Sequence, residues 1–322
     1  MIERKGVNLM KHAKKSTKKQ KVIRFFIPMF LIGALGFCSY QIGHKLYDYY
    51  KSDSYYSKVQ DTLAEGEPVD PVTDGEEDIP IVKGAQQIDW EQFKDTDAVA
   101  WVQLDKTSYP IYHDDGSMFY LSHLPDGTYA SAGSIFLYGD NSGDFTDQSS
   151  FVYGHNMLNG TMFGRLKQYA KQEYGDYYFY IYLPDGTRHK YQFFSVASVG
   201  ESSKAYTWSF ANEDSFLKWQ QWMKDQSLIS CSAPIDASKR FVTLSTCNGT
   251  IGTTKRLIIC GQEVAVERVQ NPASWYADYA AKLEAQKQKA VQTILERDTA
   301  LQDIYVKTAN DLYDSRRKEG TD

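Results

Sequence analysis

The sequence predicts a mostly β fold: a closed mixed β-barrel with peripheral helices, an N-terminal transmembrane helix and a long C-terminal helix. Short segments with strand character recur from residue 99 to residue 264 and are separated by turns. The turn sequence LPDGT occurs twice, at 124–128 and 183–187. A charge-free apolar run lies near the N-terminus, and a segment without Pro or Gly, rich in good helix formers, lies near the C-terminus.

The first residues are strongly basic, whereas the rest of the chain is acidic. Nine of the 36 lysines and arginines lie within residues 1–24, which contain only one of the 41 acidic residues, although the whole chain has a net charge of −5. The remaining chain therefore has 27 basic and 40 acidic side chains. An acidic domain repels phosphate groups, so the composition excludes nucleic acid as its partner.

Residues 23–43 are expected to form a transmembrane anchor. The run from Phe25 to Gly43 contains no charge, and about 20 apolar residues are needed to cross a bilayer as a helix. Because basic residues stay on the cytoplasmic side, residues 1–22 are predicted to be cytoplasmic and the rest extracellular. A cleavable signal peptide is the alternative. The acidic, Pro- and Gly-containing sequence within residues 44–86 is typical of a stalk and linker.

The barrel is predicted to occupy residues 87–267. Its expected strands cover 99–104, 134–137, 150–154, 177–183, 189–199, 241–247 and 256–264. The segment 212–226 begins at Asn212, which is a good N-cap, and has large apolar residues along one side. We therefore expect an amphipathic helix there, lying on the barrel. The acidic segment 139–147 does not have EF-hand spacing and is interpreted as a turn.

Cys247 is the candidate nucleophile. It ends the apolar, β-branched run FVTLSTC and is followed by Asn-Gly, a turn signal, so it should lie at a strand end that faces a cleft. A buried and inert cysteine is the plainer alternative. The cysteine spacing has no metal-binding pattern, and no metal or other cofactor is expected. A Cys231–Cys260 disulfide stays open, and it would leave Cys247 as the free thiol.

A reactive thiol needs a neighbouring base or cation, because the thiolate is the nucleophile. Among the six histidines, His155 is the best partner on local grounds, since it follows the predicted strand 150–154 and has Gly154 beside it. His189 begins an alternating run and is expected to be a solvated strand residue. On these grounds His155 is selected by elimination.

A third group comes from the segment after the cysteine. If the strands 241–247 and 256–264 pair, alternation places Arg256 and Cys247 at one end of the same groove. Arginine stays charged and cannot act as a base, but its fixed donors can hold a developing oxyanion. A surface salt bridge is the alternative role for Arg256.

These residues together resemble a known family. The motif TLSTC, followed nine residues after its cysteine by the arginine of TTKRLIICG and preceded by VYGHN, resembles the sortases, and within them class B. The resemblance covers roughly residues 87–265. It implies a sortase-type barrel and assigns the family's catalytic cysteine, histidine and arginine to Cys247, His155 and Arg256. It further implies that the substrate is contacted by Ser245, Asn141 and Thr246. The chain departs from the class before Asn141, where Asp140 replaces the usual arginine.

The resemblance also implies an activity and partners. A sortase is a cysteine transpeptidase that cleaves a C-terminal sorting motif of secreted proteins after a threonine. It then joins the product to an amine of peptidoglycan or of a pilin, through a thioacyl intermediate that would form on Cys247. Two other classes stay open: a cell-wall cysteine hydrolase that uses water, and a non-catalytic surface scaffold with a membrane anchor.

Residues 268–322 lie beyond the resemblance. Apolar residues recur at spacings of four and seven: Tyr279, Leu283, Ala290, Ile294, Leu301, Tyr305 and Leu312. This eleven-residue repeat keeps an apolar stripe nearly straight along a helix. We expect one helix over residues 272–318 whose distal half projects from the barrel and binds a partner, such as a second copy of the chain.

Overall fold

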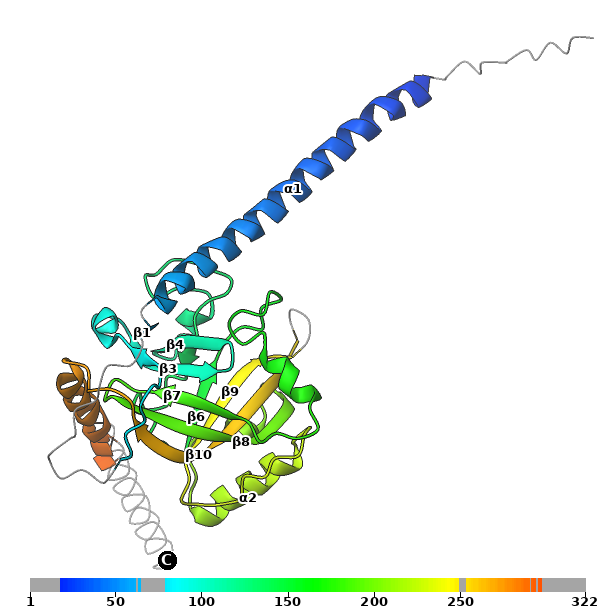
Figure 1. The fold of residues 1–322 in the computed structure, drawn as a ribbon. Coiled ribbons are helices and arrows are strands. Elements are labelled where there is room, and N and C mark those ends of the chain that lie inside the picture. The colour runs from blue at the N-terminus through cyan, green and yellow to red at the C-terminus, as the bar shows by residue number, and fades with distance from the viewer. Residues whose placement is uncertain are drawn as a thin grey trace, which may run out of the picture. The chain divides into compact units, whose positions relative to one another are not determined.

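The computed structural model describes residues 18–61, 63–64, 79–248, 253–289, 291–293 and 295–296 (Figure 1). The chain divides into two compact units, Met1–Lys51 and Ser52–Asp322. Helix α1 (Lys18–Gln60) supplies all the described structure of the first unit. Within it, Phe25–Gln60 contains a stretch that is long and apolar enough to cross a membrane, judged by length and composition. The predicted N-terminal apolar helix is thus confirmed.

Eight strands of the second unit form a closed barrel in the order β10-β8-β7-β3-β4-β5-β6-β9. Figure 1 shows α2 lying beside the barrel near β8 and β10. The strands are β3 (Ala98–Leu104), β4 (Thr107–His113), β5 (Phe136–Leu137), β6 (Ser149–Tyr153), β7 (Tyr178–Tyr182), β8 (Thr187–Gly200), β9 (Phe241–Cys247) and β10 (Lys255–Arg268). The β4·β5 and β6·β9 pairs are parallel, and the other neighbours are antiparallel. The predicted closed mixed barrel is confirmed.

Strand β4 was not among the predicted strands. Its sequence contains Pro110, which lacks the N–H that a central strand needs and argues against such an assignment. The structure tolerates this proline because β4 pairs with β5 only at Tyr112 and His113. Over Thr107–Ile111 its one strand partner is β3, so Pro110 occupies an edge-like position there.

The last turns of α1 belong to the barrel unit. Tyr56 is buried, and its hydroxyl donates to the carbonyl of Gly133 and to Ser134 Oγ, both at 3.0 Å. A short sheet of β1 (Leu63–Ala64) and β2 (Gln87–Ile88) follows. The stalk sequence therefore packs on the barrel well before residue 87, where the catalytic domain was predicted to begin.

Short helical segments cover the barrel. They are the 3₁₀ turns η1 (Trp90–Phe93), η2 (Phe119–Leu121), η3 (Leu166–Lys171) and η4 (Lys204–Tyr206), and helix α2 (Glu213–Asp225). The predicted amphipathic helix is confirmed as α2. Asn212 and Ser215 close its N-terminus with a capping box. Phe216 and Trp219 pack against Phe241 of β9, and this fixes α2 on the outer face of the strand that ends at Cys247.

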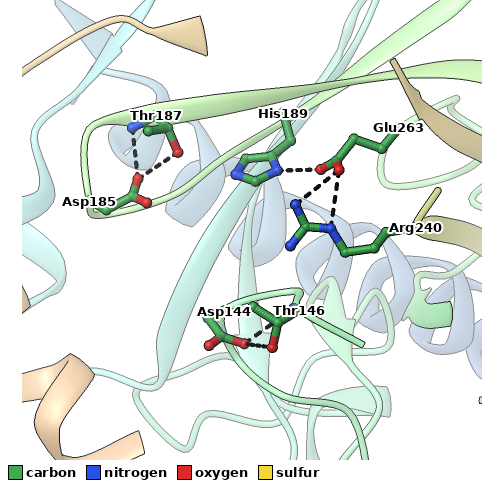
Figure 2. A network of polar contacts seen from close by, with 7 residues as sticks. All are labelled: Asp144, Thr146, Asp185, Thr187, His189, Arg240 and Glu263. Carbon is green, nitrogen blue, oxygen red and sulfur yellow. Dashed lines mark hydrogen bonds and ion pairs between the residues drawn. The ribbon is translucent and has the colours of Figure 1, made fainter. Parts of the chain in front are cut away.

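His189 is a buried residue with a specific partner, and the expectation of a solvated strand position was wrong. It is 6% exposed, and its Nδ1 lies 2.6 Å from Glu263 Oε1. The other oxygen of Glu263 accepts from Arg240 Nε and Nη2, at 3.1 and 2.9 Å (Figure 2). Alternation alone did not reveal that the face of β8 that carries His189 is the buried one.

This network predicts an acid-sensitive component of stability. Burial acts to raise the pKa of Glu263, but the hydrogen bond from His189 and the charges of His189 and Arg240 outweigh it, so the pKa lies below its ordinary value of 4.5. A lowered folded-state pKa gives stability that is present above 4.5 and lost as the pH falls through the folded value. Between pH 6 and pH 3, the free energy of unfolding measured in urea should therefore fall less steeply in Glu263→Gln than in the native chain. Asp214→Asn, at an exposed pair on α2, is the matched control. Equal pH slopes would contradict the prediction.

The segment after the barrel is helical at 276–289, 291–293 and 295–296. Its beginning contacts the barrel unit. Trp275 Nε1 donates to the carbonyl of Trp90 at 3.1 Å, and Lys287 Nζ lies 2.6 Å from Asp144 Oδ2. A C-terminal helix is thus confirmed. Its expected extension to residue 318 and the projection of its distal half lie outside the described residues.

Candidate active site

Strand β9 carries Cys247 to one end of the barrel. Phe241, Thr243, Ser245 and Cys247 alternate along the face that α2 covers, and the intervening residues face the opposite side. The side chain of Cys247 is half-buried, and its thiol is free. A strand end with a partly open thiol is the position expected for a nucleophile.

The other two cysteines of this unit are less suited to attack. Cys260 is fully buried, and burial raises the pKa of its thiol to about 12. Burial likewise raises the pKa of Cys231. Both are free thiols in the structure, so the Cys231–Cys260 disulfide does not form here. A high pKa keeps a thiol protonated at neutral pH, and Cys247 is left as the candidate nucleophile.

Arg256 lies directly opposite Cys247. The two residues are Cα partners in the antiparallel β9·β10 pair, so their side chains emerge on the same face next to each other. Arg256 Nη1 donates to the carbonyl of Thr253 at 2.8 Å, and Nη2 forms an ion pair with Glu201 Oε2 at 2.8 Å. The guanidinium is thus held beside the thiol by Thr253, in the loop before β10, and by Glu201, directly after the end of β8.

His155 reaches the same strand end from the other side. Strand β6 runs parallel to β9, with Tyr153 opposite Ser245. The residues on both sides of the histidine bond to β9: Gly154 N donates to the Ser245 carbonyl at 3.1 Å, and Asn156 Nδ2 donates to the Cys247 carbonyl at 2.9 Å. His155 is therefore anchored beside Cys247. Its Nε2 donates to the carbonyl of Leu121 at 2.7 Å.

Three residues that the sequence analysis did not single out complete the surroundings. Asn156 fixes the backbone at the cysteine, Glu201 fixes the arginine, and Tyr206 bonds Ser245 Oγ through its hydroxyl at 2.8 Å. Burial raises the pKa of Tyr206, so this hydroxyl stays protonated at neutral pH. Asn156 ends the VYGHN motif and so was within reach of sequence reasoning, whereas Glu201 and Tyr206 have no local sequence signal, because they reach the site from the segment after β8.

The three predicted substrate-contact residues, Ser245, Thr246 and Asn141, occupy different positions relative to the thiol. Ser245 lies on the face of Cys247, two residues before it. Thr246 is 3% exposed and lies on the opposite face of β9. Asn141 is buried, and its amide makes three internal bonds: to Asp147 Oδ2 (3.0 Å), to the Ser149 carbonyl (2.9 Å) and from Phe151 N (2.9 Å). Asn141 therefore holds its own loop to β6, and of the three only Ser245 lies on the thiol face.

The family model for the sortase domain matches residues 103–264, half of the chain, and these residues include Cys247, His155 and Arg256. This chain belongs to the sortase family. The curated relatives it matches are both sortase B proteins. That of Listeria monocytogenes is 29% identical over 172 residues, covering 52% of this chain and 70% of the relative. That of Staphylococcus aureus is 27% identical over 175 residues, covering 53% and 71%.

Solved structures give the same fold. The S. aureus sortase B–substrate complex matches with a TM-score of 0.50 and 24% identity, over 55% of this chain and 84% of that chain. Sortase B from B. anthracis matches with a TM-score of 0.53 and 21% identity, over 68% and 99%. Sequence relatives and fold together make this sortase a member of class B, and hence a cysteine transpeptidase.

The Glu201–Arg256 ion pair suggests a measurable effect on turnover. Glu201 is half-exposed, so solvent screens the pair and its loss should cost little stability. Glu201→Gln should nevertheless loosen the guanidinium and lower kcat/KM of this sortase about two- to fivefold. Steady-state kinetics with a cleavable peptide would measure this, with Glu173→Gln, at an exposed position, as the control. A variant with unchanged kcat/KM would show that the carbonyls of Thr253 and Lys255 suffice to position Arg256.

Proposed function

We propose that this sortase cleaves a C-terminal sorting motif of secreted proteins after a threonine and joins the product to an amine of peptidoglycan or of a pilin. The observation that carries the proposal is the placement of Cys247 between Arg256, its partner on β10, and His155, which is bracketed by two bonds to β9. The S. aureus structural neighbour was solved as a substrate complex.

The proposed reaction has two acyl transfers. The Cys247 thiolate attacks the threonine carbonyl carbon, and Arg256 stabilises the oxyanion that forms. The C–N bond then breaks, and His155 gives a proton to the departing amine, which leaves a thioacyl enzyme. An acceptor amine attacks the thioester and loses a proton to His155, and the C–S bond breaks, which restores the Cys247 thiolate and the protonated His155. All the bonds and protons in these two steps are accounted for by the protein and its substrates.

Ser245 and Tyr206 are proposed to line the substrate groove. Tyr206 stacks on Tyr153 with ring centroids 6.1 Å apart, and Tyr138 lies between Tyr153 and the half-exposed Trp208. This row of rings extends from the thiol face and offers an apolar wall for residues before the scissile threonine. Asn141 and Thr246 are left out of this proposal because their side chains are committed or face away.

The enzyme is proposed to be a single-pass membrane protein with a cytoplasmic N-terminus and an extracellular catalytic domain. Helix α1 supplies an apolar stretch of sufficient length, and basic residues precede it. The proposed parts are a basic segment at 1–22, an anchor at 23–43, a stalk and linker at 44–86, the catalytic barrel at 87–267 and a helical extension at 268–322.

The decisive experiment uses the full-length chain with a library of threonine-containing sorting peptides and an added amine such as triglycine. A transpeptidase yields the amide adduct, which mass spectrometry distinguishes from the acid that a hydrolase would release. A surface scaffold would release neither product. Adduct formation that needs Cys247 would support the proposal, and acid as the sole product at saturating amine would overturn it.

The distal C-terminal helix is proposed to bind a partner, for which a second copy of the chain is the first candidate. Because residues 275–287 contact the barrel unit, a truncation should spare them. Removing residues 297–322 is expected to leave peptide cleavage unchanged and to shift the chain to a smaller assembly. Sedimentation velocity in detergent measures this, and an unchanged assembly would contradict self-association.

A further inference from the structure

A large cavity lies beside the beginning of the C-terminal helix. It measures about 1060 Å³ and is lined by residues 94–99, by loop residues between 113 and 139, and by the C-terminal helix between 275 and 286. Cys247, His155 and Arg256 are absent from its walls. A cavity of this size matches the range of about 300–1,000 Å³ that is usual for ligand sites.

The walls of this cavity are strongly acidic. Two lysines, Lys94 and Lys282, line it, against six aspartates: Asp95, Asp97, Asp114, Asp115, Asp126 and Asp278. Clefts lined by one sign of charge concentrate ligands of the other sign. The charge alone therefore favours a cationic ligand over a neutral or anionic one.

Asp114 adds an independent observation. Asp114 is only 2% exposed and is one of the residues that line the cavity. Oδ1 accepts from Gly116 N at 2.8 Å and from Met118 N at 2.9 Å, which fixes the side chain. Oδ2 is buried and has no hydrogen-bond partner among the residues that the structure describes. Leaving a buried charged acceptor without a donor costs free energy, so a ligand that supplies the donor would gain binding free energy.

Aromatic rings complete the lining. Phe119, Tyr120, Trp275 and Tyr279 all contribute to the cavity wall. Tyr120 donates its hydroxyl to Asp97 Oδ2 at 2.6 Å and so orients one of the carboxylates. Aromatic faces next to carboxylates suit an organic cation, which gains both cation–π and ionic contacts. In the part of the chain that the structure describes, no three acidic, His or Cys side chains are grouped to hold a metal ion.

We propose that this cavity binds a lysine-bearing peptide segment, with the lysine ammonium on Asp114 and its aliphatic stem along the aromatic wall. The volume exceeds what a single ammonium group requires and leaves room for the neighbouring peptide units. The proposal does not depend on which motif or acceptor the enzyme uses, since Cys247, His155 and Arg256 are absent from the cavity walls.

The test is isothermal titration calorimetry on the full-length chain in detergent. The titrants are acetyl-Gly-Lys-Gly-amide and the same peptide with an acetylated lysine side chain. We expect saturable binding of the first peptide only. Asp114→Asn should weaken this binding about tenfold, because it removes the charge but keeps the Oδ1 acceptor.

Asp278→Asn provides a second variant whose folding is secure, since Asp278 is exposed on the helix. It should weaken binding about threefold. The matched control is Asp214→Asn, which lies outside the cavity on α2 and should bind as the native chain does.

Three results would overturn the proposal. One is equal binding of the lysine and acetyl-lysine peptides. Another is that both single variants, Asp114→Asn and Asp278→Asn, bind the lysine peptide with unchanged affinity. This would mean that water alone occupies the position beside Asp114. The third is saturation by calcium chloride at a lower concentration than the peptide, which would assign the cavity to a metal ion.

Discussion

Replacing Cys247 by alanine is expected to abolish both peptide cleavage and amide formation while leaving the barrel folded. The side chain is half-buried at the end of β9, and among the described residues its sulfur is not committed to a disulfide or a core contact that the fold needs. The reaction has no other route to a thioacyl intermediate, so turnover should fall to the uncatalysed level. Product analysis by mass spectrometry and a thermal unfolding curve measure the two expectations.

Cys231→Ala is the matched control, because Cys231 is also half-buried but lies on neither β9 nor β10. Burial raises the pKa of its thiol, so its removal should leave turnover intact. A thioester trapped on Cys231 or on Cys260 would refute the assignment of Cys247.

Arg256→Ala is expected to lower kcat/KM by about 10²–10³, the usual cost of losing one oxyanion donor. The guanidinium is pinned by Thr253 and Glu201 next to the thiol and needs little rearrangement when charge develops. The kcat/KM of Arg256→Lys should lie between those of the native enzyme and Arg256→Ala, because an ammonium supplies the charge without the planar pair of donors.

Arg188 supplies the control for this arginine. It too is paired with a glutamate across β8 and β10, with Nε 2.6 Å from Glu267 Oε2, but it lies toward the other end of β10. Arg188→Ala should reduce stability and leave kcat/KM of the folded enzyme unchanged. If Arg256→Ala kept nearly full activity, Arg256 would have no part in oxyanion stabilisation.

Local patterns predicted much of the barrel. The alternation in residues 241–247 and 256–264 marked β9 and β10, and it correctly placed Cys247 and Arg256 on one face. The same logic missed β4, where Pro110 breaks the usual pattern of a strand. It also misjudged His189, because alternation does not report whether a second layer covers the strand.

The position of His155 could not be derived in this way. His155 reaches Cys247 through the parallel β6·β9 pair, which joins residues about 90 positions apart. Periodicity within either strand holds no information on that partner, so local reasoning selected His155 only by elimination, and the family resemblance assigned the same residue. Glu201 and Tyr206 were missed for the same reason. Asn141 was singled out by resemblance, yet its amide is satisfied within its own loop.

The parallel pairing of β6 with β9 has a consequence for how the enzyme is made. Parallel strands need a long crossover, and β9 and β10 are the last barrel strands to leave the ribosome. Pairings of such high contact order form slowly, after the local hairpins. The thiol therefore meets His155 only when the barrel closes, whereas Arg256 comes next to it earlier, through the local antiparallel β9·β10 pair.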